Sequence, residues 1–252
     1  MSLVRKSVLL LFAGALLAAA PDATTLTLVR RAVADPGRAA QRVDDPRRHP
    51  VELVALAELR PGQRVLELIP GTGYWTRIFS KIVGPRGRVY AVWPEAYGKV
   101  SVAKVQMLQA MSASRDYANV VTQVQPNILP RAPEPLDLVW TADNYHDYND
   151  KFMGNPGPAA FAKAVHGLLK PDGRFIVIDH AAARGRGMQD TEALHRIERA
   201  TVIAQVTRAG FRLVGESAVL ANPADPLDIP VFDPKIRGKT SQFALVFRKT
   251  GK

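Results

Sequence analysis

Short apolar runs alternate with segments of helical periodicity along most of the chain. Residues 65–69 form an apolar run with one acid inside it, which is typical of a strand buried on both faces. Trp75, Ile78, Phe79 and Ile82 follow at spacings i, i+3, i+4 and i+7, which predict one face of a helix. Similar runs predict six further strands, at residues 88–93, 120–124, 136–141, 174–180, 211–217 and 242–249.

Further helices are predicted between these strands, at residues 100–111, 161–169 and 198–209. Strands that alternate with helices form βαβ units, so we expect an α/β fold: a Rossmann-like, doubly wound, mostly parallel seven-stranded sheet with helices on both faces. The last two strands make a hairpin-like pair, so one strand near the C-terminus is expected to be antiparallel. Right-handed crossovers place the carboxyl ends of the parallel strands at one rim, where we expect the functional site.

The first 20 residues have a different pattern. Arg5 and Lys6 precede the apolar residues 8–20, and small residues end that stretch, which predicts a secretory signal peptide at residues 1–20. We therefore expect a periplasmic or secreted protein with no stable membrane span after cleavage. A membrane-anchored protein is the alternative, although the stretch is shorter than the roughly 20 apolar residues of a spanning helix.

The rest of the chain is interpreted as two parts. Residues 21–60 form an N-terminal helical arm, with helices at residues 26–34 and 51–59, and residues 61–252 form the main domain. The arm is expected to cover an edge of the site, as a lid or by simple packing.

Charge and cysteine content narrow the function classes. The chain carries 34 Lys and Arg against 23 Asp and Glu, a formal net charge of +11. These basic residues are scattered, without a stripe interleaved with aromatic residues, so we interpret them as a solvated surface and expect no specific nucleic-acid partner. There is no cysteine, which excludes disulfides and thiolate metal ligands. The oligomeric state stays open.

The turn after the first strand is the main candidate for chemistry. Pro70, Gly71, Thr72 and Gly73 separate that strand from its helix, so a ligand can approach bare backbone and the positive end of the helix. Glu67 is an acid where a structural buried strand would have an aliphatic residue. A tight βα loop without a ligand is the alternative, because a lone GxG pattern has low specificity.

Several motifs resemble class I S-adenosylmethionine-dependent methyltransferases. Val65-Leu66-Glu67-Leu68-Ile69-Pro70-Gly71-Thr72-Gly73 resembles their first motif. Residues 87–92, 136–139 and 168–174 resemble the second strand, the fourth strand and the segment leading into the fifth, in the same order. The resemblance covers residues 61–249 and rests on the order of the motifs. The signal peptide and residues 144–147 and 237–240 further resemble a group of predicted bacterial methyltransferases of unknown substrate.

The resemblance implies S-adenosylmethionine as the cofactor. Glu67 would hold the methionine amino group through the loop, and the turn formed by Pro70, Gly71, Thr72 and Gly73 would let the cofactor lie close to the backbone. The resemblance also implies a small-molecule acceptor.

The chain departs from the family pattern at three places. Ile69 stands where the family usually has glycine, and Trp93 stands where the second strand usually ends in an acid. Glu95 is then the nearest acid for the ribose. After the third strand, where an aspartate often binds the adenine amino group, Asn127 is the nearest polar residue.

Methyl transfer depends mainly on positioning, and only an acidic nucleophile needs a general base. His146 and His180 follow the fourth strand and end the fifth, and are the candidates for that role, although a structural histidine is the commoner case. His166 is expected at the surface, and His195 is a weaker candidate. Because the five histidines are dispersed without ligand spacing, no metal site is expected.

Two functions follow from these observations. The first is an S-adenosylmethionine-dependent methyltransferase with an unknown acceptor, for which Tyr74, Trp75, Trp140, Tyr145 and Tyr148 favour an aromatic or lipid-like molecule, unless they belong to the core. The second is an exported, non-catalytic binding module that keeps the fold, favoured by export away from a cytoplasmic cofactor and by the residues at positions 69 and 93.

Overall fold

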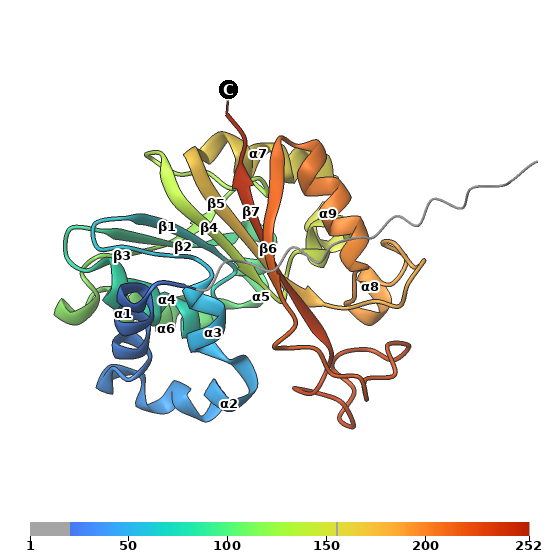
Figure 1. The fold of residues 1–252 in the computed structure, drawn as a ribbon, viewed down its shortest axis with the longest axis horizontal. Coiled ribbons are helices and arrows are strands. Elements are labelled where there is room, and N and C mark those ends of the chain that lie inside the picture. Colours follow the sequence, from blue (N-terminus) through green and yellow to red (C-terminus); the bar gives the residue numbers. More distant parts are fainter. Residues whose placement is uncertain (1–20, 155, 252) are drawn as a thin grey trace, which may run out of the picture.

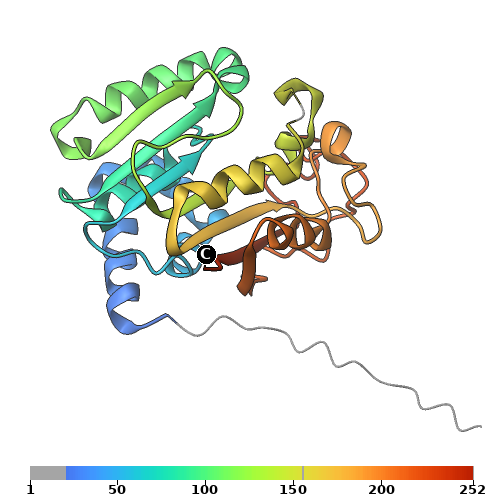
Figure 2. The ribbon, with the colours of Figure 1, turned by 90° about the horizontal axis from the view of Figure 1, so that it is seen from above.

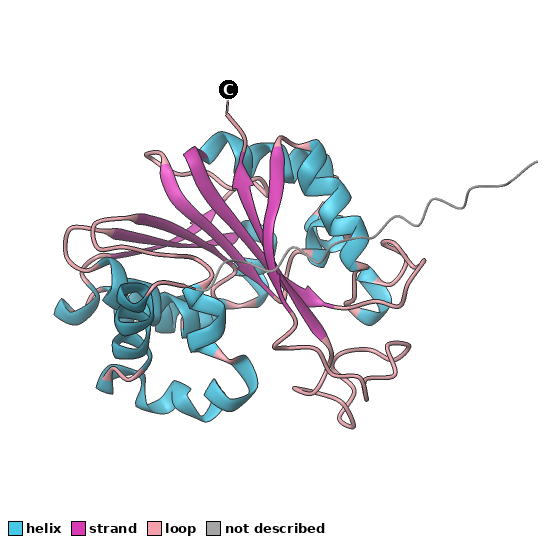
Figure 3. Ribbon diagram, in the orientation of Figure 1, coloured by secondary structure: helices cyan, strands magenta, loops and turns pink. Residues whose placement is uncertain are grey.

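The computed structural model describes residues 21–154 and 156–251, in which a seven-stranded sheet is flanked by helices on both faces (Figures 1 and 3). The strand order is β3-β2-β1-β4-β5-β7-β6. β7 runs antiparallel to both β5 and β6, and the other pairs are parallel. The strands are β1 Arg64–Leu68, β2 Arg88–Pro94, β3 Val120–Gln125, β4 Leu136–Ala142, β5 Leu169–His180, β6 Phe211–Ser217 and β7 Gln242–Lys249.

The helices divide between the two faces of the sheet, as Figure 2 shows from above. The helices of the first half of the chain are α1 Ala23–Val33, α2 Asp45–Arg48, α3 Pro50–Ala55, α4 Tyr74–Val83, α5 Glu95–Val100 and α6 Val102–Ser112. The second half contributes α7 Pro158–Leu168, α8 Thr191–Leu194 and α9 Arg199–Arg208. The longest 3₁₀ helix is η1 Pro36–Asp44, with 9 residues. Shorter 3₁₀ helices are η2 Arg115–Tyr117, η3 His146–Asn149 and η4 Lys151–Met153.

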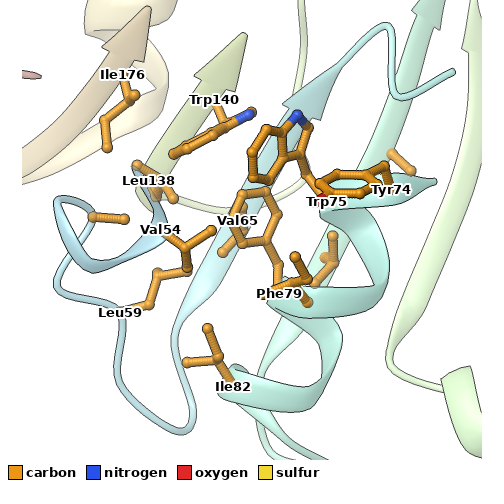
Figure 4. Close-up of a cluster of buried hydrophobic side chains, with 14 of the residues drawn as sticks. Val54, Leu59, Val65, Tyr74, Trp75, Phe79, Ile82, Leu138, Trp140 and Ile176 are labelled. Atoms are coloured by element: carbon orange, nitrogen blue, oxygen red, sulfur yellow. The ribbon is translucent and has the colours of Figure 1, made fainter. Parts of the chain in front are cut away.

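One face of the sheet packs against α1, α3, α4 and α6. Alternate strand residues such as Val65 and Trp140 point to this face, because successive side chains of a strand point to opposite sides. The helical periodicity seen in the sequence is confirmed, since Ile78, Phe79 and Ile82 of α4 are all buried there. Figure 4 shows Phe79 and Trp75 packed around the indole of Trp140.

The opposite face packs against α7 and α9 and is rich in aromatic rings. Phe161 of α7 lies between Tyr145, Tyr148 and Phe175, and its ring stacks on that of Tyr148 with centroids 3.8 Å apart. Tyr145 and Tyr148 are therefore core residues, which is the alternative that the sequence left open for them, and they do not face an acceptor.

The predicted fold class and all seven strands are confirmed, and the boundaries differ at a few places. β5 begins five residues before the predicted strand, because Leu169 already pairs with Leu136. The predicted turn is instead an irregularity within β5, where the register with β4 shifts between Leu136 and Leu138. Asp172 takes φ 60° inside this irregular stretch. The helix predicted at residues 100–111 is α6, and the short helix α5, which ends at Val100 directly before it, was not predicted. The arm helices are α1 and α3, each within a few residues of its predicted position.

A partly buried polar contact through Asp45 joins the arm to the main domain. The guanidinium of Arg38 is fully buried and pairs with Asp45 at 2.8 Å, while the Tyr74 hydroxyl at the start of α4 donates to the same carboxylate at 2.5 Å. The predicted signal peptide lies outside the described residues. Within residues 21–154 and 156–251, no helix combines the length and apolar character needed to cross a bilayer.

Candidate functional site

A cavity of about 310 Å³ lies at the carboxyl ends of β1 and β4. In a parallel α/β sheet this edge is where ligands bind, because the strand order reverses there and the loops diverge. The lining combines the turn after β1 with aromatic and basic side chains from other elements: Arg48, Glu67, Leu68, Ile69, Pro70, Gly71, Thr72, Tyr74, Trp75, Tyr97, Lys104, Trp140, Ala142, Asp143, Asn144 and Phe232.

The glycine turn has the backbone shape expected for a ligand-facing loop. Gly71 takes φ 58° and has open space where a Cβ would be, so nothing but backbone faces the cavity there. Gly73, with φ 78°, is the N-cap of α4, and a Cβ on it would come within 2.4 Å of Leu108. Pro70, Gly71 and Thr72 line the cavity as predicted, whereas Gly73 lies behind them as the cap.

Ile69 adopts a left-handed conformation, with φ 49°. A β-branched residue at positive φ is strained, and this is the position where the resembling family usually has glycine. The chain thus adopts a left-handed conformation at this position without the residue type that favours it. The Ile69 N–H donates to the Val92 carbonyl at 2.8 Å, which helps to hold that conformation.

Glu67 lines the same cavity but is almost fully buried. The Thr76 hydroxyl of α4 donates to its Oε2 atom. Burial raises the pKa of Glu67 to about 8, against the opposing effects of Thr76, Arg48 and Arg77. The side chain is therefore a neutral carboxyl at neutral pH until a cationic ligand group favours the carboxylate.

Two other predicted binding residues lie outside the cavity lining. Glu95 begins α5 directly after β2, where a ribose-binding acid is expected, but its carboxylate is exposed and pairs with Lys99 at 3.0 Å. Trp93, which stands where the family usually has the ribose-binding acid, is fully buried in the core. Asn127 is exposed in the loop after β3 and does not reach the cavity.

A second, larger cavity of about 640 Å³ adjoins the first, and the two share Arg48, Asp143 and Phe232. The lining brings together residues from the arm, the strand ends and the β6–β7 loop. Asp143 is the one carboxylate in the lining of this cavity. Four Arg and Lys side chains also line it: Arg47, Arg48, Arg237 and Lys239. Its apolar wall consists of Val219, Leu220, Val231 and Phe232. This basic cavity is the candidate acceptor site.

His146 lies at the edge of the basic cavity and is held by two carboxylates. Its Nδ1 atom is 2.7 Å from Asp179 Oδ1, its backbone N–H donates to Asp179 Oδ2 at 2.8 Å, and its Nε2 atom is 3.3 Å from Asp147 Oδ1. Although burial opposes a charged ring, Asp179 and Asp147 raise the pKa of His146 well above its ordinary value. An imidazolium has no lone pair for a proton, so this arrangement favours a positioning role over a general base.

His180 ends β5 and also faces the basic cavity. Burial lowers its pKa, so the ring is neutral. The Gln242 amide nitrogen, which can only donate, lies 3.3 Å from His180 Nδ1, so the proton belongs on Nε2, which is 3.9 Å from Asp143. Neither predicted histidine therefore presents a free basic nitrogen to the cavity.

The structure also adds two side chains that the sequence did not single out, and it brings His195, the weaker candidate, close to His146. Arg48 reaches both cavities from the end of α2, and the Asp179 carboxylate orients His146. His195 lies beside His146, with ring centroids 5.4 Å apart. An acid directly before His180 at a strand end was the available signal for Asp179, whereas Arg48 and His195 reach the site only through the tertiary fold. His166 is half-buried against Phe211 rather than free at the surface.

The sequence matches known methyltransferases over part of its length. The family model for protein-L-isoaspartate(D-aspartate) O-methyltransferase matches residues 38–125, which include the turn after β1. The ubiquinone/menaquinone biosynthesis C-methyltransferase of Shewanella frigidimarina is 27% identical over 140 residues, covering 55% of this chain and 49% of that protein. The chain thus spans about half the length of the curated relatives it matches.

Solved structures agree in fold across most of the chain. An S-adenosylmethionine-dependent methyltransferase from Aquifex aeolicus gives a TM-score of 0.53 at 18% identity, covering 88% of this chain and 97% of the other. The [4+2]-cyclase SpnF gives a TM-score of 0.57 at 16% identity, covering 90% and 93%, so the fold also serves a different reaction. The two sequence matches, together with the strand order and the turn after β1, support the class I S-adenosylmethionine-dependent methyltransferase superfamily for this chain.

Proposed function

We propose that the protein is an S-adenosylmethionine-dependent methyltransferase that acts on an anionic small molecule. The main supporting observation is that the β1 turn, with Glu67 behind it, faces a cavity that adjoins a second, basic one. The first would hold the cofactor and the second the acceptor. The donor set fits the cofactor, because Gly71 leaves backbone exposed and Glu67 supplies an acid for an ammonium group.

S-adenosylmethionine, when bound, supplies a sulfonium methyl group for an in-line displacement. The chain's contribution is then to hold the acceptor nucleophile in line and to exclude water, which is where most of the rate enhancement comes from in such reactions. Trp75 and Trp140 form the apolar wall of the cofactor cavity, and their rings are 5.1 Å apart. Arg48 and Asp143, shared by the two cavities, mark the place where both reactants would meet.

The charge of the basic cavity supports an anionic acceptor. Lys239 and Arg237 face it from the β6–β7 loop, and neither has an ion-pair partner among the described residues. His146 and His180 offer no free basic nitrogen that could act as a general base. The site therefore suits an acceptor whose nucleophile is already deprotonated, since such an acceptor needs no general base. The apolar wall that includes Phe232 leaves room for an aromatic or lipid-like part of the same molecule.

Calorimetry tests the cofactor half of the proposal. The protein should bind S-adenosylmethionine or its demethylated product, and Glu67→Ala should weaken binding by about 1–3 kcal/mol, the value of a charged hydrogen bond. Glu95→Ala is the matched control, because Glu95 is exposed and lies outside the cavity lining. This variant should bind the cofactor with the same affinity as the wild type. An equal loss in both variants would contradict the assignment of Glu67.

A methyl-transfer screen tests the acceptor half. Carboxylated and phosphorylated aromatic molecules should be methylated in preference to neutral phenols and quinones of similar size. Lys239→Gln should raise KM for the anionic acceptor about tenfold and leave cofactor affinity unchanged, because it removes ground-state binding at the acceptor alone. Preferential methylation of neutral acceptors would overturn the anionic class but not the methyltransferase assignment.

An exported binding module that keeps the fold is the second candidate. Strain at Ile69, the buried Trp93 and the exposed Glu95 favour it, because each weakens the cofactor side of the site. Folded protein that gives no binding heat with either form of the cofactor at millimolar concentration would make this candidate the better one.

A further inference from the structure

Three residues with metal-ligating side chains meet between η3 and the end of α8, at the edge of the basic cavity. We propose that His146, Asp147 and His195 bind a divalent first-row transition-metal ion, with Zn²⁺ as the reference occupant. This inference does not depend on the proposed methyltransferase activity. It replaces the expectation, drawn from the dispersed histidines, that the chain has no metal site.

The donor atoms have the separation that such an ion requires. Asp147 Oδ1 lies 3.3 Å from His146 Nε2 and 3.9 Å from His195 Nδ1, and all three donor atoms lie within 4.8 Å of one another. Bonds of about 2.0–2.2 Å to nitrogen and oxygen would hold neighbouring donors roughly 3–3.5 Å apart. Only His195 needs to approach, and it is the partly exposed member of the three.

Second contacts orient two of the three donors. Asp179 lies 2.7 Å from His146 Nδ1, which places a proton on that nitrogen and leaves Nε2 as the atom that faces the cluster. The Tyr97 hydroxyl donates to Asp147 Oδ2 at 2.8 Å, which leaves Oδ1 toward the two histidines. A carboxylate on the far nitrogen of a histidine is the usual way in which proteins fix a metal-ligating imidazole.

The local charge also favours a cation. Asp147, Asp150 and Asp179 are all buried, and no lysine or arginine in the described part of the chain pairs with any of them. Asp150 Oδ1 is buried without a hydrogen-bond partner among the described residues. Arg196, the residue after His195, gives its charge to Asp225, so the ion-pair partners of Asp147 and Asp179 among the described residues are His146 and the part-exposed His195.

The site has a route for entry. The side chain of His195 is 31% exposed and its ring packs on Phe232, which also lines the basic cavity, as does His146. His195 itself takes φ 54° at the C-terminal end of α8, a conformation that places its ring beside Asp147 at a backbone cost. Two nitrogen donors and one oxygen donor suit Zn²⁺ and its neighbours, whereas Mg²⁺ prefers all-oxygen sites.

The metal-free alternative is an ion-pair network in which protonated His146 balances Asp147 and Asp179. That alternative gives His195 no essential role, so the His195→Ala variant separates the two. The test uses the full chain, stripped of metal with a chelator and then dialysed, followed by calorimetric titration with ZnCl₂ and native mass spectrometry. Co²⁺ in place of Zn²⁺ adds a visible spectrum that reports the ligand geometry.

We expect one Zn²⁺ per chain, no binding of Mg²⁺, and a rise in Tm on addition of Zn²⁺. His195→Ala should lower the Zn²⁺ affinity at least about tenfold, and Asp179→Asn, which acts through His146, about 10–100-fold. His166→Ala is the matched control, since His166 packs on Phe211 away from the cluster, and it should bind Zn²⁺ like the wild type. Circular dichroism confirms that each variant is folded.

Absence of one-to-one binding by folded wild-type protein would overturn the site. Equal affinity in His195→Ala and wild type would do the same, because the ion would then occupy an adventitious position. A preference for Mg²⁺ over Zn²⁺ would also contradict the donor set.

Discussion

The hydroxyl of Thr76, in the first turn of α4, donates to Glu67 near the end of β1. This bond crosses the glycine turn and joins the strand to the helix that follows it. Among the described residues it is the only hydrogen bond made by the side chain of this nearly fully buried acid.

Thr76→Val should therefore destabilise the protein by about 1–3 kcal/mol, because it keeps the shape of the side chain and leaves a buried carboxyl unpaired. Urea unfolding at neutral pH gives the change in free energy. Thr27→Val is the matched control, because Thr27 is exposed and bonds only the Ala23 carbonyl of its own helix. It should change stability by no more than about 0.5 kcal/mol. Similar losses in both variants would show that the Thr76 hydroxyl has no special role.

Glu67 should make stability depend on pH. Because its pKa is about 8 when folded and near 4.5 when unfolded, the folded state binds this proton more tightly. The resulting stabilisation is complete below pH 4.5 and is lost as pH rises through about 8. In Glu67→Gln the fall in Tm between pH 5 and pH 8 should be smaller than in wild type. Glu95→Gln, at an exposed acid, should keep the wild-type slope, and a slope unchanged in Glu67→Gln would refute the assignment.

The same titration predicts that cofactor binding releases a proton. An ammonium group of the ligand favours the Glu67 carboxylate, so binding at pH 7 must expel the proton that the free carboxyl holds. Affinity should rise with pH up to about 8. Calorimetry in two buffers of different ionisation enthalpy counts the protons released, and Glu67→Gln should release fewer than the wild type.

At position 69, the usual order of stability of alanine and glycine variants should be reversed. At ordinary positions glycine is less stable than alanine by about 0.5–1 kcal/mol, because it loses more backbone freedom on folding. At φ 49° the alanine keeps the strain that glycine removes, so Ile69→Gly should be more stable than Ile69→Ala. Urea unfolding of the two variants compares them directly. An alanine variant that is equally or more stable would mean that the left-handed conformation is not maintained.

Arg196 and Asp225 form a fully buried ion pair that anchors the β6–β7 loop, with a distance of 2.8 Å. Asp225→Asn should cost about 3–5 kcal/mol, because it leaves the buried guanidinium without its counter-charge. Glu216→Gln, which breaks the exposed pair with Arg199, should cost no more than about 1 kcal/mol. Differential scanning calorimetry measures both. A small loss in Asp225→Asn would indicate that water reaches Arg196.

Local patterns in the sequence were sufficient for the sheet and for the turn after β1. Strand length, glycine position and the α4 periodicity each depend on neighbours within about ten residues, so Val65 to Ile82 could be interpreted without a tertiary fold. Tyr145 and Tyr148 show the limit of such reasoning. An aromatic residue after a strand has the same pattern whether it faces a cavity or packs on α7, and only the position of Phe161 decides between them.

The polar part of the site depends on long-range geometry. Asp179 lies 33 residues after His146 and contacts it because β4 and β5 are neighbours. His195 reaches Asp147 through the short helix α8 and a left-handed residue, neither of which has a clear sequence signal. Glu95 and Asn127 have suitable places in the chain order, but their side chains are exposed and lie outside the cavity lining.

The position of β7 has a consequence for how the chain folds. This strand is the last to be synthesised among the described elements, yet it lies between β5 and β6 and pairs with both. Until it arrives, β6 has no partner strand and β5 has an open edge that another chain can pair with. Sheet completion must therefore follow synthesis of residues 242–249, so the second half of the sheet assembles late and is the part most exposed to misassembly.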